Sequence, residues 1–421
     1  MSQSSVLTLG VGAFAHSVCK ILADRGALVA TYLTRPYGHY PPSLVGPTFG
    51  HASSPPLADL LRDLAVDLVV PQSIDWARAP WANDLLRSGV GVFSPTGEGM
   101  RIERERDFAR ALCERYRIPF PKSYVADSQD AAEAMVRAEG LPFVIKNPLC
   151  SPGSPIHTIV CETVDETCAW LSRVNFQEGA FLQEYVGRAE AGHIAFVSAG
   201  EIFPIVTNQE YKRAFAGNTG IVAGAPLGGI VERDERDKYG LCHELLFPLL
   251  PWFRSVNYHG PIQVTAARHD GRWKVLEYNI RIGVTSGAML LRMMSNPTEV
   301  IRAVTRNEPP APQWRPHMRF GCSVTLAGYG YPFTQIEGPP MPIEHAAVAD
   351  GSTCDLWWNE VSLDAAGKLN AIGHRLADAI GYADDLPEAI ARAYGILRKI
   401  RSAGSYYRND VGASLWPPGN V

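Results

Sequence analysis

The chain has 421 residues, of which 46% are hydrophobic and 19% are charged, with 38 Gly and 32 Pro. This composition is typical of a folded globular protein and excludes disordered and collagen-like classes. The 39 Lys and Arg residues nearly balance the 43 Asp and Glu residues, which gives a net charge of −4. Since the sequence contains no run of five or more like charges, we expect no nucleic-acid partner.

The eight cysteines are scattered, without a C-x-x-C pair, and lie mostly in apolar segments. This usage is typical of free thiols in a reducing compartment. The first charged residue is Lys20, and no apolar stretch approaches the roughly 20 residues of a membrane-spanning helix. We therefore expect a cytoplasmic protein without a membrane partner, divided into about two to four domains.

Short apolar runs alternate with helical patterns through the first hundred residues. Such alternation predicts a parallel sheet covered by helices. Ligands bind such sheets at the carboxyl ends of strands, which points to the turn after Leu9 and to residues 71–75. The predicted strands are 6–9, 28–33, 68–70 and 90–93, and the predicted helices are 15–25, 57–64 and 80–88.

Beyond residue 104 the pattern predicts two helices, at 104–116 and 128–139, and then a region dominated by strands. Residues 307–315, N-E-P-P-A-P-Q-W-R, are too rich in proline to continue a helix and predict a linker. Short strands and one helix at 386–400 are expected in the last hundred residues. The predicted strands before the linker are 143–146, 158–160, 181–185, 193–198, 202–207, 260–267 and 273–278.

The most informative motif is V-L-E-Y-N-I-R at residues 275–281. Alternate side chains of a strand share a face, so Glu277, Asn279 and Arg281 converge on one side. Carboxylate and amide oxygens suit Mg²⁺, and an arginine fork can hold a phosphoryl or carboxylate oxygen. A solvated edge strand of alternating polarity explains the same spacing. The opposite face is expected to carry Leu276, Tyr278 and Ile280.

Two further segments are compatible with nucleotide binding. Lys146 ends a predicted strand and is followed by N-P-L-C-S-P-G-S-P, a loop that is not a Walker sequence but can bring a lysine to a phosphate. Residues 181–186, F-L-Q-E-Y-V, lead into a turn where Glu184 or Glu190 can meet an adenine and its ribose. A surface lysine before a turn and an exposed acidic turn are the alternatives.

In their order along the chain, these segments resemble the ATP-grasp ligases, and most closely phosphoribosylamine–glycine ligase, the glycinamide ribonucleotide synthetase of purine synthesis. The resemblance rests on V-I-K with its glycine-containing loop, Q-E-Y-V, N-Q-E-Y-K-R, N-T-G-x-x-x-G, V-L-E-Y-N-I-R-I-G and M-L-L-R-M. It extends nearly end to end through V-L-T-L-G-V-G, V-F-S-P-T, V-T-L-A-G-Y-G-Y-P and S-Y-Y-R-N-D-V-G.

The resemblance implies an ATP-grasp fold of mixed α/β and α+β class. It implies a Rossmann-like domain at 1–100, an ATP-grasp domain at 101–312 with a small subdomain at about 120–186, and a small β-rich domain at 313–421. It also implies ATP and Mg²⁺ or Mn²⁺ as cofactors, and small-molecule carboxylate and amine substrates bound by a monomer or homodimer. In the implied reaction, ATP phosphorylates the carboxylate, and the amine displaces phosphate to give an amide, ADP and phosphate.

The resemblance assigns roles to individual residues. The metal ligands are Glu277 and Asn279, and the catalytic residues are Arg281, Lys212 and Arg213. ATP contacts come from Arg106, Lys146, Gln183, Glu184, Val186 and Glu190, where Arg106 stands in place of a lysine. Substrate contacts come from His16, Asp75, Asn218, Thr219 and Gly283.

The chain departs from the family at motifs that recognise substrate or phosphate. The first turn, Gly-Ser-Gly-Gly-Arg-Glu-His in the family, reads G-V-G-A-F-A-H here, with Phe14 and Ala15 in place of a charged pair. Gln72 replaces a glutamate, Ser154 replaces the lysine of the phosphate loop, and G-V-T-S at 283–286 replaces Gly-Asp-Pro-Glu.

Since the metal pair is retained while these motifs change, we expect an amide-forming ligase for a substrate other than phosphoribosylamine, in specialised metabolism. A pocket with His16, Phe14, Asp75 and Trp76 would suit a less charged or aromatic-bearing substrate. A true phosphoribosylamine–glycine ligase is the alternative.

Two other classes compete with the ligase. A nicotinamide dehydrogenase is suggested by the strand, G-x-G and helix at the N terminus, and Ala15 satisfies the third small position of that fingerprint. However, the next strand ends in Thr34-Arg35 without the expected acid. A non-catalytic ATP or metabolite sensor agrees with the altered phosphate loop, but it would not need to retain metal and phosphate ligands together.

Overall fold

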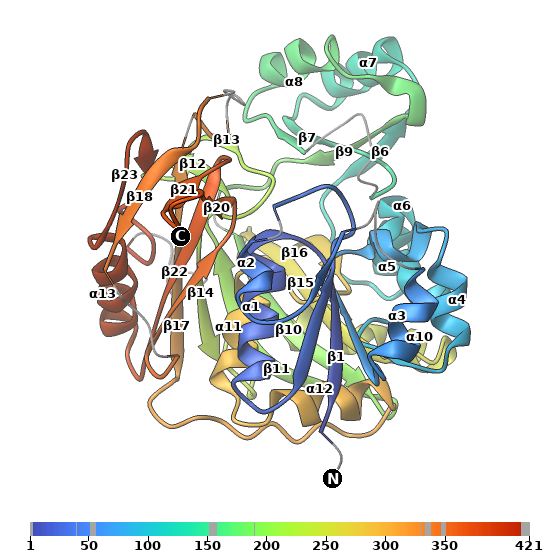
Figure 1. Ribbon diagram of the computed structural model, residues 1–421. Helices are drawn as coiled ribbons and strands as arrows, with labels where there is room; N and C mark the ends of the chain where they lie inside the picture. Colours follow the sequence, from blue (N-terminus) through green and yellow to red (C-terminus); the bar gives the residue numbers. More distant parts are fainter. Residues whose placement is uncertain are drawn as a thin grey trace.

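The computed structural model describes residues 3–413 apart from residues 39, 51–55, 151–157, 189, 329, 333–337 and 347–350 (Figure 1). The N-terminal part is a five-stranded parallel sheet in the order β3-β2-β1-β4-β5, which confirms the predicted parallel sheet. The order reverses between β1 and β4, so the crevice lies between the ends of these strands. The strands are β1 Ser5–Leu9, β2 Leu28–Tyr32, β3 Thr48–Phe49, β4 Leu68–Pro71 and β5 Gly91–Val92.

Short helices cover this sheet. The predicted helix at 80–88 is shorter, and a 3₁₀ turn at 74–78 precedes it. The elements are α1 Gly12–Ala23, α2 Tyr40–Ser43, α3 Leu57–Asp63, η1 Ile74–Arg78, α4 Ala82–Arg87 and η2 Gly97–Met100.

The predicted helix at 104–116 corresponds to α6 Arg106–Arg115, and a short helix that was not predicted, α5 Arg101–Arg104, precedes it. The break lies at Glu105, whose backbone is extended and forms a bridge to Leu149. The Arg106 N–H then donates to the Pro148 carbonyl at 3.0 Å instead of continuing a helix. The break therefore brings the first residue of α6 against the loop that follows Lys146.

A small four-stranded sheet in the order β6-β9-β7-β8 stands at the top of the molecule, with α7 and α8 above it (Figure 1). Ser128 caps α7 through its side chain, and Gly140 ends that helix at φ 65°, as expected for 128–139. The elements are β6 Ser123–Ala126, α7 Gln129–Glu139, β7 Phe143–Lys146, β8 Ile159–Val160, α8 Val164–Leu171, η3 Phe176–Glu178 and β9 Ala180–Glu184.

The large sheet has the order β16-β15-β10-β11-β14-β17-β22-β19, and β24 pairs with β17. Because β14 pairs with β17, the sheet runs on across the predicted linker; the division at residue 312 stays a prediction. The strands are β10 Glu190–Ser198, β11 Glu201–Glu210, β14 Gly228–Arg233, β15 Gly260–His269, β16 Arg272–Asn279, β17 Phe320–Gly328, β19 Cys354–Trp358, β22 Arg375–Ala383 and β24 Ser405–Tyr406.

Helices and two smaller sheets complete the fold. The hairpin β12 Arg213–Phe215 and β13 Thr219–Val222 lies between the large and small sheets, and β20-β21-β18-β23 form another sheet. The helices are α9 Leu241–Leu245, η4 Phe247–Leu249, α10 Leu250–Ser255, α11 Ser286–Met293, α12 Pro297–Thr305 and α13 Leu386–Leu397. The strands are β18 Met341–His345, β20 Val361–Leu363, β21 Leu369–Ala371 and β23 Ile400–Ser402.

One apolar core joins the N-terminal sheet to the large sheet through α1 and α11. All eight residues of α11 are buried, including Arg292, whose guanidinium lies 2.7 Å from both Asp355 and Asp24. These ion pairs tie α1 to β19 across the core. Within the described part of the chain, the eight cysteines are free thiols, and no helix is long and apolar enough to cross a membrane.

Candidate active site

The V-L-E-Y-N-I-R motif contains a β-bulge at Leu276. Thr265 of β15 pairs with Glu277 and Ala266 pairs with Val275, so Leu276 has no partner in the ladder. Val275 is buried before the bulge and Tyr278 after it, which means that the extra residue reverses the alternation. The prediction that Glu277, Asn279 and Arg281 share the outer face of the strand agrees with their partial exposure. Of the residues predicted on the opposite face, Tyr278 and Ile280 are buried, whereas Leu276 at the bulge is half-buried.

Lys146 at the end of β7 occupies the space beside the bulge. Its ammonium donates to Gln183 Oε1 at 2.7 Å and to the Leu276 carbonyl at 3.1 Å. Burial and the nearby charge of Arg106 lower the pKa of Lys146 to about 8, although Glu277 opposes the change. Lys146 is therefore a buried cation with neutral hydrogen-bond partners, and the alternative of a surface lysine is wrong.

Glu277 is surrounded by cations. Its carboxylate lies 3.4 Å from Lys212 Nζ and 3.7 Å from Arg106 Nη1. Burial raises the pKa of Glu277, but Lys212, Lys146, Arg106 and Arg281 outweigh burial and hold that pKa well below its usual range. The side chain is an ionised carboxylate that keeps 26% of its surface exposed.

Lys212 is held by three carboxylates. Besides Glu277, its ammonium lies 3.0 Å from Glu190 and 3.7 Å from Glu210. Burial disfavours the ammonium, but these carboxylates outweigh burial and raise the pKa of Lys212. Burial raises the pKa of Glu210, whose carboxylate lies close to Gly283. Lys212 therefore stays positively charged beside Glu277.

Arg281 lies two residues beyond the end of β16, near Glu103, Glu277 and Glu210. Its Nη2 donates to Asn279 Oδ1 at 3.1 Å, and its Nε lies 3.3 Å from Glu103 Oε1. The other Glu103 oxygen accepts the Ile280 N–H at 2.7 Å. The sequence reasoning missed Glu103, although it stands three residues before Arg106 in the segment already compared with the family.

Four cations and four carboxylates thus meet where β7, β16, α5, α6 and the end of β11 come together. Arg106 also donates through Nε to the Asn147 carbonyl at 2.9 Å, so its fork is fixed by the backbone on one side. The eight residues are Arg106, Lys146, Lys212, Arg281, Glu103, Glu190, Glu210 and Glu277.

The remaining predicted ATP contacts lie next to this cluster. Gln183 is buried and holds Lys146, while Glu184 Oε2 accepts the Lys122 N–H at 3.1 Å. Val186 is buried in the segment between β9 and β10. Their roles around adenosine stay a prediction. Ser154 of the phosphate loop lies outside the described residues.

Three predicted residues have partners away from Glu277. Arg213 Nη2 lies 2.7 Å from Glu162, which follows β8 in the small subdomain. Asn218 donates to the Arg188 carbonyl at 3.0 Å, and Thr219 donates within its own turn to Ala216 at 3.0 Å. Arg213 and Asn218 thus connect the hairpin to its surroundings, Thr219 bonds within the hairpin turn, and Lys212 lies within the cluster.

Of the N-terminal residues predicted to bind substrate, Asp75 lies in the 3₁₀ turn that follows β4, whereas His16 is buried within α1. Phe14 and Trp76 are buried in the core, so the predicted aromatic-lined pocket is not formed by them. His16 Nδ1 accepts the Trp358 N–H at 2.9 Å, and burial lowers the pKa of His16 to about 4, so its ring is neutral. Asp75 accepts a hydrogen bond from Ser73 at 2.9 Å.

The donor set at β16 fits Mg²⁺. Glu277 offers an ionised carboxylate and Asn279 an amide oxygen, both hard ligands, and both are partly exposed on one face of the strand. Mg²⁺ commonly takes one or two such protein ligands and completes its shell with phosphates and water. The cations Lys146 and Arg106 lie close to this donor set and would add positive charge beside a bound metal.

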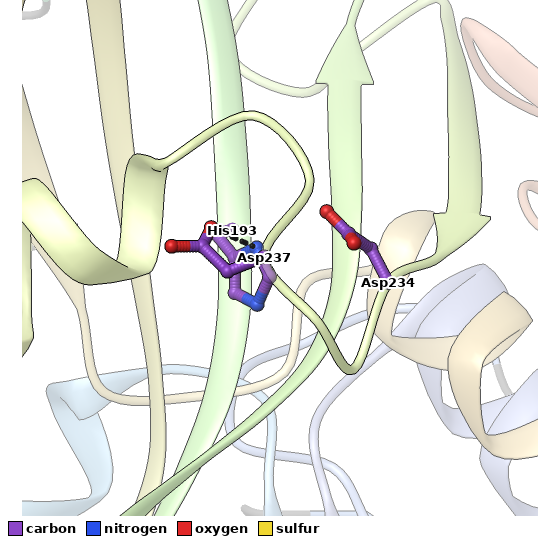
Figure 2. Close-up of side chains that lie close together, drawn as sticks. All are labelled: His193, Asp234 and Asp237. Atoms are coloured by element: carbon purple, nitrogen blue, oxygen red, sulfur yellow. Dashed lines mark ion pairs between the residues drawn. The ribbon is translucent and has the colours of Figure 1, made fainter.

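A second group with the geometry of a metal site lies elsewhere, at His193, Asp234 and Asp237 (Figure 2). Protein donors already use all four carboxylate oxygens: Asp237 accepts the Cys242 and His243 N–H groups, and Asp234 accepts the Lys238 N–H and the Thr207 hydroxyl. The His193 Nδ1 lies 3.1 Å from that hydroxyl. Burial lowers the pKa of His193 to about 4. We assign this group a structural role, in which Asp237 caps α9.

No family model matches the chain. The chain is 29% identical over 342 residues to the phosphoribosylamine–glycine ligase of Halalkalibacterium halodurans, covering 77% of each protein. It is 25% identical over 349 residues to that of Neisseria meningitidis serogroup A, covering 78% of this chain and 80% of that protein. The crystal structure of the ligase from Thermotoga maritima matches with a TM-score of 0.75 and 21% identity, over 96% of this chain and 99% of that chain. The chain is therefore similar to phosphoribosylamine–glycine ligases over about three quarters of its length and has the same fold as the ligase from Thermotoga maritima.

A more distant structural neighbour shares the ATP-grasp fold. The biotin carboxylase domain of Hydrogenobacter thermophilus 2-oxoglutarate carboxylase matches with a TM-score of 0.69 and 12% identity, over 97% of this chain and 92% of that chain. That structure contains MgADP and bicarbonate. The predicted fold class and the predicted resemblance to phosphoribosylamine–glycine ligases are therefore confirmed.

Proposed function

We propose that the chain joins a carboxylate to an amine through an acyl phosphate. A carboxylate oxygen attacks the γ-phosphorus of ATP, the bond to the bridging oxygen breaks, and ADP leaves. The amine then attacks the acyl carbon, loses a proton, and expels phosphate to leave an amide. The observation that carries the proposal is the row Glu277, Asn279 and Arg281 facing a cluster of fixed cations.

Each cation of the cluster has a part in this chemistry. Lys146 and Arg106 meet the ATP phosphates, and Arg281 meets the reacting carboxylate. Lys212 keeps its positive charge among three carboxylates and stabilises the charge that develops during transfer. Since phosphoryl transfer depends mainly on positioning and charge neutralisation, groups fixed before the ligand binds are what the reaction requires. Mg²⁺ held by Glu277 and Asn279 would supply further neutralisation at the phosphates.

We further propose that the amine substrate is not phosphoribosylamine. Residues 10–16 contain no Lys or Arg. The Val11 N–H in that turn already donates to Gln72 Oε1 at 2.9 Å. A sugar phosphate normally needs such N–H groups or a cation, so this crevice favours a less charged amine. Phosphoribosylamine–glycine ligase activity, named for the curated relatives, is the alternative.

The test is release of ADP and phosphate with MgATP across a matrix of carboxylates and amines, with Glu277→Gln as the blank. One pair in the matrix is glycine with phosphoribosylamine. ADP formed only with that pair would refute the proposed change of amine and leave the ligase chemistry intact. ADP formed with another pair supports both proposals. If ATP binds but no pair of substrates gives ADP, the result would favour a non-catalytic sensor.

A further inference from the structure

Glu103 is a buried carboxylate at the junction of α5 with the end of β16. Its side chain is only 6% exposed, and each of its oxygens has a different partner. Oε2 accepts the Ile280 N–H at 2.7 Å, and Oε1 lies 3.3 Å from Arg281 Nε. A charged side chain is rarely buried unless it is paired, so these two contacts account for its position.

We propose that Glu103 is a positioning residue that sets the direction of Arg281 in the reaction cleft. This proposal rests on the proposed function, in which Arg281 meets the reacting carboxylate. Glu103 acts through Arg281 and does not itself contact substrate.

The geometry of the guanidinium supports this role. Glu103 takes the Nε edge of the fork and Asn279 takes Nη2, and among the described residues none bonds Nη1. Glu103 and Asn279 thus hold the Nε and Nη2 sides of the guanidinium, and Nη1 is left for a ligand. An arginine fork pre-oriented in this way can bind a planar carboxylate without first losing the rotamer freedom of its long side chain.

The backbone contact adds to the constraint. Ile280 follows Asn279, the last residue of β16, so the Ile280 N–H lies where the chain leaves the sheet. By accepting this N–H, Glu103 fixes the backbone immediately before Arg281 as well as its side chain. The Glu103 carboxylate thus contacts both the backbone that precedes Arg281 and the guanidinium at the end of its side chain.

A purely structural role, in which Glu103 only joins α5 to β16, makes different predictions. Glu103→Gln retains an oxygen for the Ile280 N–H but places an amide N–H₂ or a weaker, neutral acceptor against Arg281 Nε. We expect kcat to fall by about 10- to 100-fold, with the dissociation constant for MgATP changed less than about twofold. The matched control is Glu105→Gln, two residues away, which weakens a partly exposed pair with Arg101 and leaves kcat unchanged.

A double substitution tests whether Glu103 acts through Arg281. If it does, Glu103→Gln combined with Arg281→Ala should be no slower than Arg281→Ala, because the second change has nothing left to orient. If the double variant instead loses kcat by the product of the two single losses, the proposal is overturned. Equal losses in kcat and in MgATP affinity for Glu103→Gln would overturn it as well.

A second readout does not depend on turnover. The Nε NMR resonance of Arg281, assigned by its loss in Arg281→Lys, should have the same chemical shift in the wild type and in Glu105→Gln, and a different one in Glu103→Gln, which removes the charge 3.3 Å from Nε. An unchanged chemical shift in Glu103→Gln would overturn the positioning role. If the NMR result is as expected while no substrate pair is turned over, the proposed function fails and the positioning of Arg281 stands.

Discussion

The buried ammonium of Lys146 predicts a pH dependence of ATP binding. A lysine pKa of about 8 instead of 10.5 corresponds to about 3 kcal/mol against the charged form in the ligand-free protein. Binding of a phosphate anion favours the ammonium, so binding takes up a proton once the pH exceeds about 8. The affinity for MgATP should therefore be constant up to about pH 8 and then fall by up to tenfold for each further pH unit.

The substitution Lys146→Met removes the positive charge of residue 146 and keeps a side chain of similar length. The substitution removes the cost of burying an ammonium but leaves Gln183 Oε1 and the Leu276 carbonyl without their donor, at about 1–3 kcal/mol for each group. These effects have similar size and opposite sign, so the free energy of unfolding should change little. MgATP affinity should fall at pH 7.5 and lose its dependence on pH.

Titration calorimetry with MgATP between pH 7.5 and 9.5 measures both quantities, and two buffers of different ionisation enthalpy report proton uptake. The matched control is Lys122→Met in the same subdomain, an exposed lysine paired with Glu139 at 2.9 Å, where the pH profile should match the wild type. A wild-type affinity that is flat from pH 7.5 to 9.5 would refute the reasoning. So would a steep profile retained in Lys146→Met.

Glu277→Gln should lower ADP release by at least about 100-fold because the metal loses its anionic ligand, and a rate near that of the wild type would contradict the metal assignment. Arg292→Ala should lower the free energy of unfolding in urea by about 3–5 kcal/mol, because the buried Asp355 carboxylate loses its partner. The double variant Arg292→Met with Asp355→Leu should recover much of this loss. If stability is not recovered, the loss does not come from an unpaired buried charge. Arg408→Met should lower kcat several-fold in the ADP-release assay, because Arg408 holds the Arg213 carbonyl at 2.8 Å beside Lys212; an unchanged kcat would show that the hairpin does not need this support.

The fold was largely predictable from local pattern. The parallel sheet follows from alternating strands and helices, and α7 follows from its Ser128 cap and from Gly140. The shared face of Glu277 and Asn279 follows from the period of a strand. These features depend on residues close together in sequence, which is the range over which a pattern carries information.

The bulge and the N-terminal crevice depend on distant residues. Leu276 is extra only relative to β15, so V-L-E-Y-N-I-R alone gives no sign that its alternation reverses. Phe14 was expected near substrate, but α1 is covered on its far side by a strand more than three hundred residues away. Trp358 of that strand donates to His16 and fixes the ring in the interior.

The partners of the four cations explain why the site could be only partly predicted. Lys212 lies among carboxylates and its pKa rises, whereas Lys146 has only neutral hydrogen-bond partners and its pKa falls, although both are lysines in similar strand-end positions. The difference comes from the three carboxylates around Lys212, whereas burial and the nearby Arg106 dominate at Lys146, whose ammonium donates to Gln183 and to the Leu276 carbonyl. A cleft that must receive a polyanion needs at least one cation that its own carboxylates do not already neutralise. In the proposed function Lys146 meets that need, and we expect its binding energy for phosphate to depend most on pH.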